Sequence, residues 1–349
     1  FMLMKEVLGF PLVFWLLSVC VYSFTLLNGF LDGCNAVATL IASRAMKPKT
    51  ALCFAATIEL LSPMTLFFTG FTVSKTIQTM VDENYYTGDV DQTKALCFIA
   101  GGILAAIIWD LFAWLSHVPS SSTHALLGGI VGASIVAYGV SSVAWGQFAY
   151  RVILMMFLAP AIGFLFGYTV MKICKAITQR ASSAANTVFK RVQLINVVLL
   201  AYSHSTHDSQ KSLGVIMLLM TICGKSIGST PPWQAVAIAG LCLAMGIMFG
   251  GYNIIKTVGM GIFKVKPIHS FASQLASAGA LIGANLTGVP VSASHVVSAS
   301  VMGVGSAERL NAVRWTNVKR IVMSWFITVP IVGALGALFY FILSLIFKA

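Results

Sequence analysis

Long apolar stretches separated by short polar or basic segments dominate the chain. Four of them, 7–27, 95–116, 151–173 and 321–347, are each long enough to cross a hydrocarbon layer of about 30 Å as a helix. Hydrophobic residues make up 58% of the 349 residues and charged residues only 9%, whereas a soluble domain carries about 25% charged residues. The pattern therefore predicts an all-α polytopic protein embedded in a lipid bilayer.

The charged residues are unevenly placed along the chain, whose net charge is +12. Basic residues gather in four clusters, and acidic residues gather between 74 and 94. The basic clusters are Arg44/Lys47/Lys49, Lys172/Lys175/Arg180/Lys190/Arg191, Lys256/Lys264/Lys266 and Arg309/Arg314/Lys319/Arg320; the acidic residues are Asp82, Glu83, Asp89 and Asp91. Because cytoplasmic loops carry the excess of Lys and Arg, we expect the basic clusters in the cytoplasm and the acidic loop outside. This distribution at alternate loops argues against nucleic acid as a partner.

The apolar stretches between these anchors give ten nominal crossings, with both termini outside. The expected crossings are 6–45, 50–70, 95–116, 118–140 and 151–173, then 192–222, 233–251, 268–288, 290–306 and 321–347. Five crossings in each half place the second half upside down relative to the first, as in inverted-repeat transporters. The predicted organisation is a first inverted repeat over 1–173, a basic cytoplasmic linker over 174–191 and a second inverted repeat over 192–349, with broken or re-entrant helices meeting at the midplane.

Two pairs of similar segments support this duplication. VPSSSTH at 118–124 and VPVSASH at 289–295 share a proline, spaced hydroxyls and a histidine, 171 residues apart. NGFLDGCNAVA at 28–38 and YSHSTHDSQKS at 202–212 align when Asp32 is placed on Asp208, an offset of 176 residues. Both offsets fit one duplication with small insertions.

The proline and hydroxyls of the repeated segments suit the start of a helix. Proline tolerates the first turn, and Ser or Thr side chains cap free backbone amides. A helix start also presents unpaired N–H groups and the positive end of the helix dipole, which attract oxyanions. Two such starts would face one another across one small oxyanion site; the alternative is that the hydroxyls only cap kinked helices.

Four acidic residues, Asp32, Glu59, Asp110 and Asp208, fall within apolar stretches, where a charge is costly and usually functional. Beside an anionic substrate such as phosphate, they must bind a cation, carry a proton or accept a hydrogen bond from a protonated substrate oxygen. For Asp110, which follows Trp109, we expect pairing with a buried donor, and a functional role is the alternative. Lys211, three residues after Asp208, is either a direct phosphate contact or a fixed positive charge in place of an ion.

The histidines and cysteines show no metal-ligand spacing. His124 and His295 close the repeated segments, and His204 and His207 precede Asp208. We expect these rings to cap helices or to hydrogen-bond an aspartate, and we expect no metal site and no cofactor. The seven cysteines are scattered through apolar segments and are interpreted as small core residues.

The chain resembles the inorganic phosphate transporter family. NGFLDGCNAVATLIASRAMKP (28–48) is similar to the family's NGFHDGANAVAT region, SHSTHDSQK (203–211) to the bacterial form SHGANDAQK, and GGYNIIKTVG (250–259) to GGWRIIKTLG. The repeated segments resemble the family's P-V-S-S/T-T-H element. The resemblance covers 26–345 and implies a non-enzymatic, commonly dimeric carrier with inverted repeats. It would import phosphate across the inner membrane of a prokaryote together with protons or sodium.

The resemblance also implies site residues. The implied phosphate-binding residues are Asp32, Asn35, Ser121, Ser122, Thr123, Asp208, Lys211, Ser292 and Ser294, and the implied coupling-ion candidates are Asp32, Glu59, Asp208, His207 and Gln274. The chain departs from the family at Leu31 (usually Asn or His), His207 (usually Asn), Gln274 (often Glu) and Asn253 (often Arg). These departures weaken the case for sodium and favour the proton. A metal–phosphate complex as cargo also fits.

Two other functions stay open on the sequence. Sulfate has nearly the size of phosphate, but it has no proton at neutral pH to donate to Asp32 or Asp208. An intramembrane hydrolase could use Ser, His and Asp. However, no GxSxG-like nucleophile setting occurs, and one nucleophile does not require serines in symmetric pairs.

Overall fold

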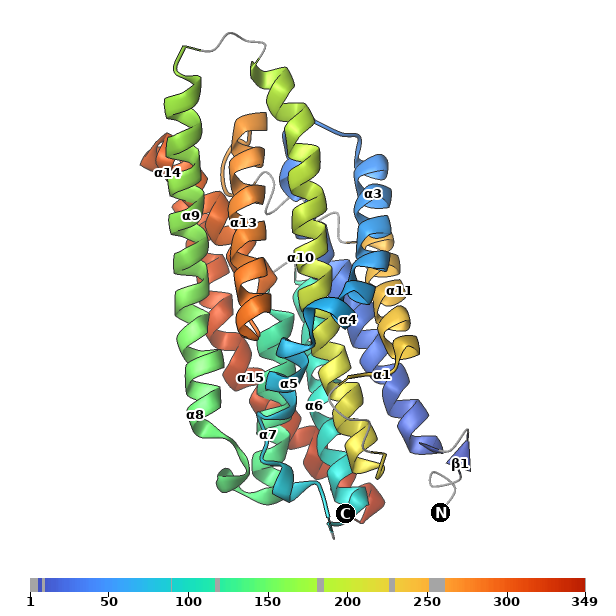
Figure 1. The fold of residues 1–349 in the computed structure, drawn as a ribbon. Helices are drawn as coiled ribbons and strands as arrows, with labels where there is room; N and C mark the ends of the chain where they lie inside the picture. Colours follow the sequence, from blue (N-terminus) through green and yellow to red (C-terminus); the bar gives the residue numbers. More distant parts are fainter. Residues whose placement is uncertain are drawn as a thin grey trace.

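The chain folds into an elongated bundle of helices that run roughly along one direction (Figure 1). The computed structural model describes residues 6–7, 10–88, 90–116, 120–180, 185–225, 230–250 and 261–348. Within this part, the only paired strands are β1 (Glu6–Val7) and β2 (Phe10–Pro11), and five helical segments are long and apolar enough to cross a membrane. The prediction of an all-α polytopic membrane protein is confirmed.

Helices of the first half begin with a long rod, Leu12–Ala42, that is interrupted by one π-helical turn. In chain order the elements are α1 (Leu12–Asn28), η2 (Gly29–Gly33), α2 (Cys34–Ala42), α3 (Pro48–Leu61), η3 (Ser62–Thr65), α4 (Leu66–Thr69), α5 (Thr72–Gln78), η4 (Glu83–Tyr85), α6 (Gln92–Leu115), α7 (Ser122–Tyr138), η5 (Val140–Ser142), α8 (Trp145–Phe148), η6 (Ala149–Leu154) and α9 (Met155–Thr178). Both η2 and η6 are π-helical.

Helices of the second half include the two longest described, α10 and α15. In chain order the elements are α10 (Ala185–Ile222), α11 (Trp233–Phe249), α13 (Pro267–Thr287), α14 (Ala293–Glu308), η8 (Leu310–Ala312) and α15 (Trp315–Phe347). The predicted linker 174–191 is therefore partly helical, since α9 continues to Thr178 and α10 begins at Ala185.

Two helical hairpins enter the bundle from opposite ends and do not cross it (Figure 1). α6 and α7 form one hairpin, and α13 and α14 form the other. The expected crossings 118–140 and 290–306 are thus re-entrant segments: α7 and α14 start near the middle of the bundle and return to the end from which their hairpins entered. The expectation of re-entrant helices that meet midway is met, and in the described part of the chain two of the ten nominal crossings return instead of spanning the bundle.

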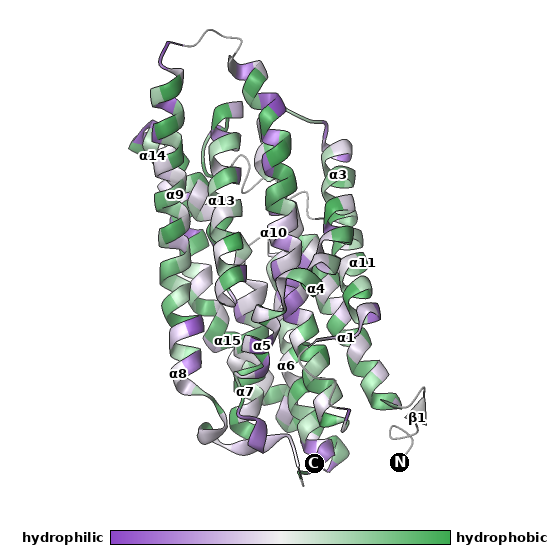
Figure 2. Ribbon diagram, viewed as in Figure 1, coloured by the Kyte–Doolittle hydropathy of each residue, from purple (hydrophilic) through white to green (hydrophobic). Residues whose placement is uncertain are grey.

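The two ends of the bundle differ in charge. One end of the bundle holds the starts of α3, α10, α13 and α15. The basic clusters of the sequence lie beside or within these helix starts. The acidic loop around η4 lies at the other end, near the start of α1 and the end of α15. Figure 2 shows apolar ribbons between these ends and a polar interval in the middle of α10.

Each returning helix packs tightly against a long helix. Gly132 of α7 lies on the backbone of Gly333 in α15, and Gly303 of α14 lies on the backbone of Phe164 in α9. At either glycine, an added Cβ would collide with the facing carbonyl oxygen. Small residues permit this close approach of helices in membranes. Since Gly303 follows Gly132 by 171 residues, the two packing arrangements match the offset of the repeated segments.

Candidate functional site

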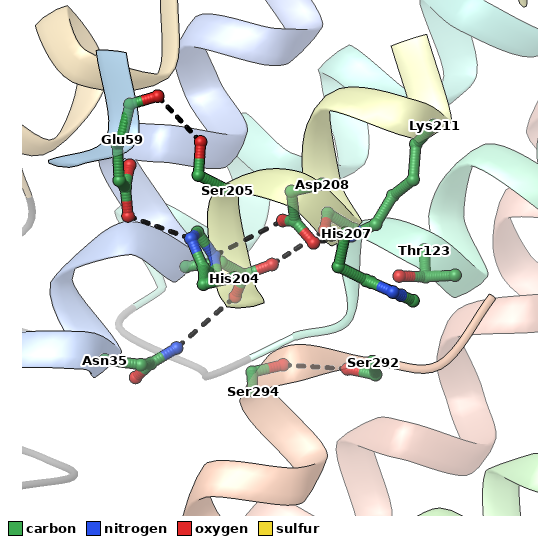
Figure 3. A network of polar contacts seen from close by, with 12 residues as sticks. Asn35, Glu59, Thr123, His204, Ser205, His207, Asp208, Lys211, Ser292 and Ser294 are labelled. Atoms are coloured by element: carbon green, nitrogen blue, oxygen red, sulfur yellow. Dashed lines mark hydrogen bonds and ion pairs between the residues drawn. The ribbon is translucent and has the colours of Figure 1, made fainter. Parts of the chain in front are cut away.

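A cluster of ionisable side chains lies buried in the middle of the apolar bundle (Figure 3). Asp32 is 3% exposed, and Glu59, Asp208 and Lys211 are each 0% exposed. Burying charges inside a membrane protein is costly and is retained mainly where the charges act. The cluster is therefore the candidate functional site.

Asp32 is presented by the π-helical turn η2 inside the rod α1–η2–α2. Its Oδ2 accepts a hydrogen bond from Ser122 Oγ at 2.7 Å, and its Oδ1 accepts one from Asn35 Nδ2 at 3.4 Å. π-Helical turns of this kind frequently occur at functional sites because they redirect side chains within a helix. Here the turn brings the carboxylate to the start of α7.

Asp208 and Lys211 extend the cluster from α10. Lys211 Nζ lies 2.7 Å from Asp208 Oδ1, and it also donates a hydrogen bond to Ser122 Oγ at 3.4 Å. Ser122 thus contacts Asp32 and the ammonium that pairs with Asp208. Through these contacts the structure brings both aspartates into one network, although they lie far apart in sequence.

Glu59 of α3 joins the cluster through His204, a residue that the sequence analysis did not place in the site. His204 Nδ1 is 2.9 Å from Glu59 Oε1, and His204 Nε2 is 3.4 Å from Asp208 Oδ2. Ser205 Oγ also donates to the backbone carbonyl of Glu59 at 2.7 Å. The position of His204 four residues before Asp208 puts both on one helix face, and this spacing was the available signal. The expected partner of such a ring was an aspartate; the hydrogen bond of His204 is to Glu59, and Asp208 lies 3.4 Å from its other ring nitrogen.

Two of the predicted hydroxyls cap the returning helices. Ser121 Oγ accepts from the amide of His124 at 3.2 Å, and Ser292 Oγ accepts from the amide of His295 at 3.4 Å. These are the N-cap roles that the capping alternative assigned to them. The rings of His124 and His295 meet at a centroid distance of 4.9 Å, so the two helix starts lie side by side.

Two further hydroxyls join the hairpin tips to each other. Thr123 Oγ1 donates to the carbonyl of Val291 at 3.0 Å, and Ser294 Oγ donates to the carbonyl of Ser120 at 3.0 Å. The tips therefore close over the cluster as a bonded pair. Of the five predicted hydroxyls, Ser122 is the one that contacts the carboxylate–ammonium network.

The remaining predicted residues lie at the border of the cluster. Gln274 of α13 donates to the carbonyl of Ala36 in α2 at 3.5 Å. His207 contacts Asn285 and Val291 on the hairpin α13–α14. Asn253 falls in 251–260, outside the described residues, as does most of the segment GGYNIIKTVG.

Asp110 differs from its expected role. Its carboxylate is 1% exposed, and neither oxygen has a hydrogen-bond partner in the part of the chain that the structure describes. The expectation of a buried donor for Asp110 is therefore wrong within that part. The neighbouring Trp109 instead donates from Nε1 to Ser120 Oγ at the hairpin tip, at 2.6 Å.

Comparisons with known proteins show the family to which the chain is similar and a solved structure with a similar fold. The model of the phosphate transporter family matches residues 28–336. A probable low-affinity inorganic phosphate transporter of Bacillus subtilis is 37% identical over 95% of this chain and 97% of its own, and one from Rhizobium meliloti is 32% identical over 98% and 100%. In fold, the chain is similar to a solved sodium-dependent phosphate transporter, with a TM-score of 0.86 at 23% identity, over 96% of this chain and all of the other.

Proposed function

The chain belongs to the phosphate transporter family, and we propose that it imports inorganic phosphate across the inner membrane of a prokaryote by symport with protons. Like its relatives, which are named as transporters, it is a transporter rather than an enzyme. The observation that carries the proposal is the buried network in which Ser122 bridges Asp32 and the Lys211–Asp208 pair.

The cluster offers what a partly protonated phosphate needs. Lys211 supplies a positive charge, and the starts of α7 and α14 supply hydroxyls and the positive ends of two helix dipoles. Asp32 and Asp208 can accept hydrogen bonds from a phosphate that keeps a proton, which sulfate at neutral pH cannot donate. We therefore assign phosphate binding to Asp32, Asn35, Ser121, Ser122, Thr123, Asp208, Lys211, Ser292 and Ser294, and we favour phosphate over sulfate.

The surroundings of the carboxylates favour the proton over sodium. Asp208 faces the Lys211 ammonium and Glu59 faces the His204 ring, so both acids are engaged by nitrogen groups. Sodium requires several oxygen ligands, and an ammonium about 4 Å away would oppose it by roughly 4 kcal/mol at an effective dielectric of 20. The alternative coupling ion is sodium, bound by Asp32, Glu59 and backbone carbonyls. The alternative substrate is a metal–phosphate complex in place of free phosphate.

We further propose that residues 1–173 and 192–349 are inverted repeats joined by a cytoplasmic linker, with both termini outside. Matched contacts support this proposal. An offset of 171 residues turns the contact of Thr123 with Val291 into the contact of Ser294 with Ser120. The same offset relates His124 to His295, and these two rings contact each other. A contact between equivalent residues is what a two-fold axis produces. The homodimer stays a proposal from the family resemblance.

Uptake of radiolabelled phosphate into proteoliposomes tests the proposed function. Inward sodium and pH gradients are imposed separately, with choline replacing sodium in the second case. We expect uptake to persist in choline, to follow the pH gradient and to collapse with a protonophore. Uptake that requires sodium and ignores the protonophore would contradict proton coupling, and a lack of phosphate uptake under both gradients would contradict the substrate.

A further inference from the structure

His207 lies where α10 meets the tip of the hairpin α13–α14 (Figure 3). Its ring is fully buried, and each ring nitrogen has one close partner. Nδ1 is 2.7 Å from Oδ1 of Asn285, and Nε2 is 3.0 Å from the carbonyl oxygen of Val291. Both partners belong to the hairpin, so the ring connects α10 to it at two points.

Both partners of His207 are acceptors. Val291 contributes a backbone carbonyl, which cannot donate. The amide of Asn285 is oriented by its other end, because Nδ2 donates to the carbonyl of Ser203 at 3.2 Å and to Thr206 Oγ1 at 3.0 Å. Oδ1 of Asn285 therefore faces His207, and it can only accept.

This arrangement fits the doubly protonated ring. A neutral imidazole carries one N–H and one lone pair, whereas an imidazolium carries two N–H groups. A neutral His207 would satisfy one contact and would place a lone pair against an oxygen in the other. An imidazolium would donate in both, in hydrogen bonds that its charge strengthens.

We propose that His207 is a proton-binding site of the transport cycle, and that its protonated ring holds the tip of α13–α14 closed over the Asp32–Asp208 cluster. The inference rests on the proposed proton-coupled transport of phosphate and names the residue that takes the proton. Both acceptors leave together when the hairpin moves, since Asn285 and Val291 lie on the same hairpin.

The charges around His207 make its proton conditional on closure. On its own helix it is near Asp208 and Lys211, which pair with each other at 2.7 Å. The described residues of the hairpin offer it neutral acceptors from Asn285 and Val291. Without these acceptors, a charged ring would be buried next to an ammonium, and both burial and like charge disfavour that state. Closure and proton binding therefore promote each other, as linked equilibria must.

Nitrogen NMR of the reconstituted wild-type protein tests the protonation state directly. The protein carries ¹⁵N-labelled histidine and is saturated with inorganic phosphate at the pH of maximal uptake, and the His207 signals are assigned by their loss in His207→Gln. We expect two protonated ring nitrogens for His207. A neutral His207 ring in the phosphate-saturated protein would overturn the proposal.

A matched pair of variants tests the role in coupling. His207→Asn keeps an amide donor but cannot titrate, and His269→Asn changes a buried histidine in the first turn of α13. We expect the acceleration of phosphate uptake by a pH gradient to fall at least tenfold in His207→Asn and to persist in His269→Asn. Wild-type coupling retained by His207→Asn would overturn this inference alone. If the wild-type protein itself showed no uptake driven by a pH gradient, the proposed proton symport would be overturned as well.

Discussion

Thr123 and Ser294 make the same hydrogen bond in opposite directions. Thr123 donates to the carbonyl of Val291 on the second hairpin tip, and Ser294 donates to the carbonyl of Ser120 on the first, both at 3.0 Å. Each hairpin is thereby held by a hydroxyl from the start of the other's returning helix. Opening either tip breaks both bonds, so the two tips are coupled through one pair of contacts.

Removing these hydroxyls should loosen the closed site. For Thr123→Val and Ser294→Ala we expect weaker phosphate binding, by about 0.5–1.5 kcal/mol for each lost hydrogen bond. Radiolabelled phosphate binding to the purified variants measures the effect. Ser344→Ala, which changes a partly exposed serine near the end of α15, is the control and should bind as the wild type does. Unchanged affinity in both tip variants would leave the tips without a role in holding phosphate.

Close helix packing gives a second prediction, on stability. Gly132→Ala should lower the thermal stability of the purified protein because its Cβ meets the backbone oxygen of Gly333, which cannot move away alone. Overpacking of this kind costs about 1–3 kcal/mol. Gly146→Ala is the matched control, since nothing lies within 4 Å of a Cβ there. If the two variants melted at the same temperature, α7 and α15 would not be packed as closely as the structure has them.

The sequence predicted the helix starts at the hairpin tips because their signal is local. A proline followed by hydroxyls marks a helix N-terminus without knowledge of the rest of the fold, and Ser121 and Ser292 cap α7 and α14 as expected. Re-entry could not be predicted in the same way. α7 has 17 residues, and at 1.5 Å per residue it is about 26 Å long, so its length alone does not distinguish a short crossing from a returning helix.

The contacts that depend on helix packing were not accessible from the sequence. Glu59 meets His204 only because α3 packs beside α10, and no spacing between 59 and 204 encodes that neighbourhood. His207 meets Asn285 for the same reason, through the packing of α10 on α13. The carboxylate of Asp110, which has no hydrogen-bond partner among the described residues, was also unpredictable, because the neighbours of a buried side chain are set by the assembled bundle.

Asp32 provides the third prediction. Asp32→Asn keeps the shape of the side chain and removes its charge, so we expect the variant to fold and to lose phosphate transport. The amide is a weaker acceptor than the carboxylate for the hydrogen bonds from the Ser122 hydroxyl and from a protonated phosphate. Asp82→Asn, at the N-cap of η4 in the acidic loop, is the control and should transport normally. Uptake in proteoliposomes and melting of the purified protein separate the two effects. Wild-type uptake by Asp32→Asn would remove Asp32 from the mechanism.

The last prediction concerns Lys211, which occupies in the second half the place of Asn35 in the first. Asp32 and Asn35 are three residues apart and in contact, and so are Asp208 and Lys211. Lys211→Asn would give both halves the same aspartate–asparagine pair and would remove the ammonium that opposes a sodium ion.

Removing a repulsion of roughly 4 kcal/mol corresponds to about a thousandfold in affinity if nothing compensates. We therefore expect sodium to stimulate phosphate uptake by Lys211→Asn but not by the wild-type protein, in proteoliposomes compared in sodium and choline buffers. The control is Lys319→Asn, an exposed lysine near the start of α15. In Lys211→Asn, Asp208 loses the ammonium with which it pairs. The melting temperature of the purified variant is therefore measured with and without sodium, and we expect sodium to raise it. Equal uptake and equal melting in the two buffers would show that Lys211 is not what excludes sodium.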